Sequence, residues 1–146
     1  MKKTLVLIAN QSRARLYTLT APNGRLEELD NRVHPEGRLK DRELGADRPG
    51  RAFDSMGRGR HAMGKHNSPS EQLSIRFAGE VVDWLDERYH RDGCERLVLV
   101  APPRFLGLIR NALTPGLARA VALAVDKDLA GVERPEDVRA QLPEWI

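Results

Sequence analysis

Positively charged side chains concentrate between residues 48 and 66. This basic segment (residues 48–66) contains five Arg or Lys residues and one acidic residue, Asp54, so its formal charge is +4. The whole chain carries only +3, so the rest of the sequence is close to neutral. A local excess of positive charge is typical of a surface that contacts a polyanion such as RNA. The residues of the segment that could contact RNA phosphates are Arg48, Arg51, Arg58, Arg60, His61, Lys65 and His66.

Arginine and glycine alternate in the middle of this segment, at Gly57-Arg58-Gly59-Arg60. A guanidinium group can pair with two phosphate oxygens and stack on an exposed base, and glycine lets the backbone approach closely. The segment lies in a longer stretch, residues 35–68, with little hydrophobic periodicity, which predicts a long flexible loop. A solvated loop without any partner fits the same composition, because ordering a loop that buries no apolar surface is costly in entropy.

Metal and cofactor chemistry has weak support in the sequence. His61 and His66 are five residues apart and could hold a transition metal, but Asp54 is the one supporting carboxylate nearby. We therefore interpret both histidines as part of the basic surface. The glycine-rich stretch also lacks the Lys-Ser/Thr ending of a phosphate-binding P-loop. We predict no metal and no cofactor.

The rest of the chain predicts the elements that must position the basic segment. Two runs of consecutive apolar residues, 5–9 and 97–101, predict strands that are buried on both faces. Three further strands are predicted at residues 15–20, 25–33 and 120–125. The strand at residues 25–33 should contain an irregularity, because its apolar residues do not alternate. Leu123 and Val125 are expected in the core with the two buried runs.

Helices are predicted between these strands. The longest begins with a capping box at Ser68-Pro69-Ser70-Glu71, places Phe77 and Trp84 on its buried face, and ends at Asp92-Gly93. Shorter helices are predicted over residues 105–113 and 135–142, with a turn at 114–116. A three-stranded meander followed by alternating helices and strands predicts one α/β domain over residues 1–146. Its mixed sheet is ribonuclease-H-like, with the order β-β-β-α-β-α-β-α and the long basic loop before the first helix.

A ribonuclease-H-like layout suggests a metal-dependent nuclease, which needs converging carboxylates, including one on the first strand. That strand has none, since Asn10 at its end is neutral. Asp126 and Asp128 follow the last strand, and Asp83 and Asp86 belong to the long helix. We predict structural roles for these acids and no catalytic residue.

The composition, with 40% hydrophobic and 31% charged residues, is typical of a soluble globular protein. Cys94 is the one cysteine, so no intrachain disulfide can form, which favours a reducing compartment. The apolar run at the N-terminus is shorter than that of a secretory signal and lacks a cleavage context. No apolar run approaches the length needed to span a bilayer. We expect a cytoplasmic protein without membrane insertion.

Short motifs across the chain resemble the bacterial family of host attachment proteins. They are Leu5-Val6-Leu7-Ile8-Ala9-Asn10, Ser12-Arg13-Ala14-Arg15-Leu16-Tyr17, Ser68-Pro69-Ser70-Glu71 and Val125-Asp126-Lys127-Asp128-Leu129. That family is in turn similar to the central domain of archaeo-eukaryotic peptide-release factors and their ribosome-rescue relatives, which has this order of elements. The resemblance implies a link to translation.

One departure from the release-factor pattern argues against peptide release. In that family a Gly-Gly-Gln loop precedes the long helix, whereas this chain has Gly57-Arg58-Gly59-Arg60-His61 in the corresponding place. Gln72 lies inside the predicted helix, where it cannot enter a catalytic centre on a glycine-rich loop. Peptidyl-tRNA hydrolysis and metal-dependent nuclease activity are therefore the less favoured functions.

Two classes of function remain. The first is a non-enzymatic RNA-binding or ribosome-associated accessory factor that uses the basic segment. The second is a factor for attachment of bacteria to host cells that acts through protein interactions. Its partner would be another protein or a second copy of this chain. Localisation separates the two classes.

Overall fold

The computed structural model describes residues 3–19, 24–34 and 68–146. The basic segment, and with it all seven candidate RNA-binding residues, lies outside the described residues.

The described residues form a five-stranded mixed sheet. Its strands are β1 (Thr4–Ala9), β2 (Arg13–Leu19), β3 (Glu27–Val33), β4 (Arg96–Val100) and β5 (Val121–Val125). They lie in the order β3-β2-β1-β4-β5. The three N-terminal strands pair antiparallel, whereas β1 pairs parallel with β4 and β4 pairs parallel with β5. This arrangement confirms the predicted ribonuclease-H-like α/β fold.

The two predicted central strands are central. All six residues of β1 are buried, and so are the last four residues of β4. The strands align with Leu5 opposite Leu97 and Leu7 opposite Leu99. Continuous apolar runs are required here because helices cover one face of the sheet and the C-terminal segment covers the other.

The two edge strands differ from the centre. Most residues of β3 are exposed, and its pairing with β2 shifts between Leu16 and Tyr17, which confirms the expected irregularity. β5 forms the opposite edge, and its residues Leu123 and Val125 are only partly buried. Their expected place in the central core was wrong, because an edge strand has a neighbour on one side only.

The long helix α3 (Pro69–Arg91) begins as predicted. The side chain of Ser68 accepts a hydrogen bond from the Glu71 backbone N–H, and Pro69 occupies the first helical position. Gly93 ends the helix with a φ of 67°, a conformation that favours glycine. Phe77 and Trp84 are buried, which confirms their core role, and the Arg32 guanidinium lies 5.1 Å from the centre of the Trp84 ring.

Three shorter helices follow, α4 (Pro103–Ala112), α5 (Pro115–Ala120) and α6 (Pro135–Arg139). We predicted only a turn where α5 lies. The side chain of Thr114 accepts a hydrogen bond from the Leu117 N–H, and Pro115 begins the helix, so the turn residues also start a short helix.

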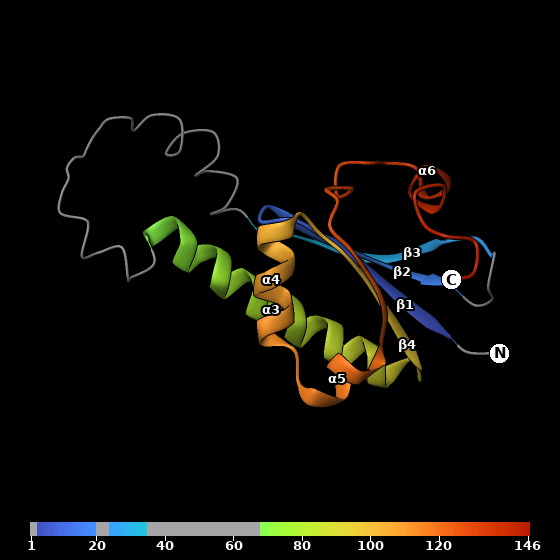
Figure 1. The fold of residues 1–146 in the computed structure, drawn as a ribbon, viewed down its shortest axis with the longest axis horizontal. Helices are drawn as coiled ribbons and strands as arrows, with labels where there is room; N and C mark the ends of the chain where they lie inside the picture. The colour runs from blue at the N-terminus through green and yellow to red at the C-terminus, as the bar shows by residue number, and fades with distance from the viewer. Residues whose placement is uncertain (1–2, 20–23, 35–67) are drawn as a thin grey trace.

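The helices divide between the two faces of the sheet (Figure 1). α3, α4 and α5 pack on one face, and α6 with the C-terminal residues covers part of the other. Phe77, Val81, Leu85 and Ile109 contribute to the first core, and Tyr17, Val98, Val138 and Ile146 to the second. Among the helices in the described ranges, none is both long and apolar enough to cross a bilayer.

Candidate functional site

Polar contacts fix the turn between β1 and β2. The side-chain oxygen of Asn10 accepts hydrogen bonds from the backbone N–H groups of Ser12 and Arg13, at 2.8 and 3.0 Å. The amide nitrogen of Asn10 donates to Oδ1 of Asp128, at 3.1 Å. Asp128 Oδ1 also accepts from the Ala130 N–H, at 3.4 Å. The turn is therefore tied to the residues that follow β5, and Asp128 has the structural role that the sequence favoured.

His34 is the last described residue before residues 35–67, which contain the basic segment. Its backbone N–H donates to the Ser12 carbonyl oxygen at 2.8 Å, and its ring Nδ1 donates to the Gln11 carbonyl oxygen at 2.9 Å. The ring stacks on Phe77 with 4.3 Å between centroids and an angle of 5°. His34 is only 6% exposed. The chain is thus anchored at His34 against the β1–β2 turn and α3.

Ser68 is the first described residue after that stretch, and it lies at the edge of a pocket of about 320 Å³. The turn after β1 and the first two turns of α3 and α4 form its walls. The described residues that line it are Gln11, Ser68, Ser70, Glu71, Ser74, Arg104, Phe105 and Leu108. The Gln11 carbonyl also accepts the hydrogen bond from His34. His34 and Ser68, which flank residues 35–67, therefore lie at the same edge of the molecule.

One ion pair joins two residues of the pocket wall, Arg104 and Glu71. Nη2 of Arg104 donates to Oε2 of Glu71, at 2.8 Å. The Glu71 carboxylate therefore pairs with Arg104, and not with the backbone of Ser68 as a complete capping box would require. The side chain of Arg104 is 80% exposed, so water screens the pair and its contribution to stability is small.

Two other features of the pocket concern hydrogen-bond donors. α4 begins without a side-chain cap, which leaves the backbone N–H groups of Arg104 and Phe105 without a capping acceptor. Ser74 is 8% exposed, and within the described parts of the chain its hydroxyl makes no hydrogen bond. The pocket thus offers several donors and one carboxylate.

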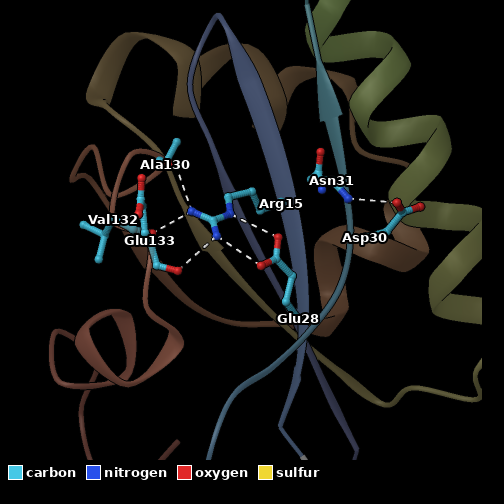
Figure 2. Close-up of polar contacts among 7 residues, drawn as sticks. All are labelled: Arg15, Glu28, Asp30, Asn31, Ala130, Val132 and Glu133. Atoms are coloured by element: carbon cyan, nitrogen blue, oxygen red, sulfur yellow. Dashed lines mark hydrogen bonds and ion pairs between the residues drawn. The ribbon is translucent and has the colours of Figure 1, made fainter.

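A buried arginine lies on the opposite face of the sheet (Figure 2). Arg15 is 5% exposed, and its guanidinium donates to both carboxylate oxygens of Glu28 and to the carbonyl oxygens of Ala130, Val132 and Glu133. The hydrogen bond to Glu28 raises the pKa of Arg15, although burial acts in the opposite direction. This cation is fully committed to structural contacts and joins the sheet to the C-terminal segment.

The residues considered for catalysis do not gather. Across residues 3–19, 24–34 and 68–146, no three His, Cys, Asp or Glu side chains lie close enough to hold a metal ion. Gln72 and Asp83 are exposed on α3, and Asp126 is exposed after β5. Cys94 is buried, and burial raises the pKa of its thiol, which agrees with its interpretation as a small core residue.

Sequence reasoning missed the residues that build this edge of the molecule. His34, Ser74 and Arg104 were not singled out, because a lone histidine, a helical serine and a surface arginine carry no local signal. Pro102-Pro103 at the end of β4 was the one available sign, since two prolines leave the next helix without a capping side chain.

Comparison with known proteins identifies the family. The family described as "Protein required for attachment to host cells" matches residues 5–142. No curated protein matches the chain. A Ppx/GppA phosphatase of Aquifex aeolicus, type II variant, is similar with 12% identity and a TM-score of 0.45, over 86% of this chain and 35% of that one. An archaeal translation termination factor is similar with 13% identity and a TM-score of 0.45, over 97% of this chain and 35% of that one.

A second Aquifex aeolicus structure of the Ppx/GppA family gives 16% identity and a TM-score of 0.39, over 84% of this chain and 34% of that one. The chain therefore spans about a third of the length of these solved structures. The family match covers nearly all of the described sheet and helices. This chain belongs to the family of proteins required for attachment to host cells.

Proposed function

We propose that this protein is a non-enzymatic RNA-binding or ribosome-associated accessory factor, and that its basic segment contacts RNA phosphates. The observation that carries the proposal is the local charge: residues 48–66 contain five Arg or Lys residues against one acid. The rest of the chain is close to neutral. A general surface charge would be spread over the domain, whereas this charge is confined to one segment.

The geometry of the described residues supports this proposal. His34 and Ser68, the described residues on either side of residues 35–67 in the sequence, both lie beside the β1–β2 turn. His34 is held by two hydrogen bonds and an aromatic stack, and Ser68 caps a helix of 23 residues. The described residues that flank the basic segment in the sequence are therefore both fixed at one edge of the fold, and binding residues are often carried by connections between fixed elements.

Binding of a single-stranded RNA by fluorescence anisotropy between 50 and 200 mM salt tests the proposal. If five cations neutralise phosphates, the slope of log affinity against log salt should be about −3.5, or roughly a hundredfold loss over this range. The variant Arg58→Ala/Arg60→Ala/Lys65→Ala should reduce the slope to about −1.4.

A matched control removes three positive charges from the described surface. Arg76, Arg110 and Arg119 are exposed, so the triple alanine variant at these positions changes the net charge equally. It should retain the slope of the wild type. Equal losses in both triple variants would show binding by overall charge and contradict a site in the basic segment. Sedimentation of lysate through a sucrose gradient would then test ribosome association, which the basic-segment variant should weaken.

The family description favours a second function, a role in attachment to host cells. A surface-exposed protein that supports attachment when the basic segment is neutralised would favour this function over the first. Cell fractionation with a surface-labelling reagent, in wild type and in the triple basic-segment variant, measures both properties.

A further inference from the structure

We propose that the pocket between α3 and α4 binds a phosphorylated ribose, with Arg104, Ser74 and the first turn of α4 holding the phosphate. This site consists of described residues and does not include the basic segment. It therefore goes beyond the proposed function and does not depend on it.

The donors of the pocket favour an anion. The uncapped N–H groups of Arg104 and Phe105 lie in the first turn of α4, and both residues line the pocket. A free N–H pair at the start of a helix is a site where phosphate oxygens are commonly bound. The first turns of α3 and α4 both contribute to the walls, so the partial positive charge of two helix N-termini lies beside the pocket.

Ser74 supplies an independent observation. Its side chain is more than nine-tenths buried and faces the pocket, yet no described residue accepts or donates a hydrogen bond at its hydroxyl. The Ser74 oxygen is not one of the completely enclosed unpaired atoms of the described residues, so it can be reached from the pocket that it lines. The Ser74 hydroxyl is therefore available to a ligand oxygen in the pocket.

Arg104 and Glu71 determine what kind of anion fits. Arg104 is exposed and pairs with a single carboxylate oxygen, so its guanidinium can turn to a phosphate at little cost. The Glu71 carboxylate then needs a new donor, and the hydroxyl groups of a ribose supply one. A simple anion would instead meet the negative charge of Glu71. This carboxylate therefore favours a phosphate that carries a hydroxylated sugar.

The size and lining agree with such a ligand. A volume of about 320 Å³ is at the lower end of the range for small-molecule sites. Phe105 and Leu108 provide apolar wall beside the polar donors. The same phosphorylated ribose could come from a free nucleotide or from the phosphorylated end of an RNA, and the experiment must separate these sources.

Titration of the full chain with AMP, followed by the backbone amide signals of Arg104 and Phe105 in NMR spectra, tests the proposal. We expect these two amides to shift with saturation. Arg104→Ala should weaken AMP binding about tenfold, because a charge-assisted hydrogen bond is lost, and Ser74→Ala about threefold. Arg110→Ala is the matched control, since Arg110 is on the same helix and exposed but does not line the pocket. It should bind AMP as the wild type does.

Glu71→Gln separates the sugar from the phosphate. This variant should bind inorganic phosphate several-fold more tightly than the wild type, because a competitor for Arg104 and a like charge are removed. The affinity for AMP should increase less than the affinity for phosphate, because the ribose hydroxyl groups lose a charged hydrogen-bond acceptor. Absence of shifts at Arg104 and Phe105, or equal weakening by Arg104→Ala and Arg110→Ala, would overturn the proposal.

Two further arms identify the source and separate the site from the basic segment. If the protein prefers a 5′-phosphorylated to a 5′-hydroxyl oligoribonucleotide and the preference depends on Arg104, the ligand is the end of an RNA. If the protein binds AMP but shows no such preference, the ligand is a free nucleotide. The variant Arg58→Ala/Arg60→Ala/Lys65→Ala should keep its AMP affinity even where its RNA affinity falls. Loss of AMP binding in this variant would place the phosphate contact in the basic segment and contradict the pocket.

Discussion

The guanidinium of Arg15 holds the carboxylate of Glu28 with two hydrogen bonds, from Nε to Oε2 at 3.2 Å and from Nη2 to Oε1 at 3.0 Å. The pair joins β2 to the edge strand β3. The same guanidinium donates to the carbonyl oxygens of Val132 and Glu133, at 2.6 and 3.3 Å, so one side chain fastens two parts of the chain to β2.

Arg15→Ala should therefore destabilise the fold strongly. We expect a loss of about 3 to 5 kcal/mol in the free energy of unfolding, because a mostly buried pair is broken and three carbonyl groups lose their donor. Urea denaturation followed by circular dichroism measures this loss. Arg134→Ala is the control, since Arg134 pairs with Glu136 in full contact with water, and it should leave the unfolding midpoint nearly unchanged. Similar midpoints for both variants would contradict the role of Arg15.

Tyr17→Phe should stabilise the protein slightly or leave it unchanged. The Tyr17 side chain is fully buried, and in the described residues its hydroxyl has no hydrogen-bond partner. Removing an unsatisfied buried hydroxyl should gain up to about 1 kcal/mol in urea denaturation at pH 7. A clear loss of stability would show that the hydroxyl has a partner.

The same variant should alter stability at alkaline pH. Burial raises the pKa of Tyr17 above its ordinary value of 10.0, so the unfolded chain releases this proton at a lower pH than the folded protein does. The contribution of Tyr17 to stability is present below about pH 10 and is lost as the pH rises further. The stability difference between wild type and Tyr17→Phe should therefore grow between pH 9 and about 11. A constant difference over this range would contradict the raised pKa.

Two leucine variants should separate the centre of the sheet from its edge. Leu7 is fully buried on β1, so Leu7→Ala should cost about 2 to 5 kcal/mol. Leu123 on β5 is only partly buried, so Leu123→Ala should cost less than about 2 kcal/mol. Chemical denaturation of both variants measures the difference. Equal losses would show that β5 is covered in solution by another surface.

We expect no hydrolysis of peptidyl-tRNA, or of RNA with Mg²⁺ or Mn²⁺. Asp128 contacts Asn10 at the end of the first strand, and its Oδ1 accepts hydrogen bonds from Asn10 and Ala130. Asp128→Asn, Asp126→Asn and Gln72→Ala should therefore leave RNA binding unchanged. Metal-dependent cleavage that Asp128→Asn abolishes would reveal a nuclease site at this turn.

Local patterns in the sequence determined much of the fold. The apolar runs of β1 and β4 predict strands covered on both faces, and Ser68-Pro69 predicts the start of α3, because these signals come from neighbouring residues. The composition of the basic segment likewise predicts its charge without any knowledge of its surroundings. The short helix α5 was missed, because six residues that begin with Thr114-Pro115-Gly116 carry the signal of a turn as well as that of a helix.

Only the tertiary structure decided which distant residues meet. Asn10 and Asp128 are 118 positions apart in the sequence, and Glu71 and Arg104 are 33 positions apart, so no local pattern links either pair. The edge position of β5, the stack of His34 on Phe77 and the pocket between α3 and α4 depend in the same way on how the chain crosses the sheet. Periodicity and capping report the nearest few residues, whereas burial and electrostatic partners are set by packing between elements.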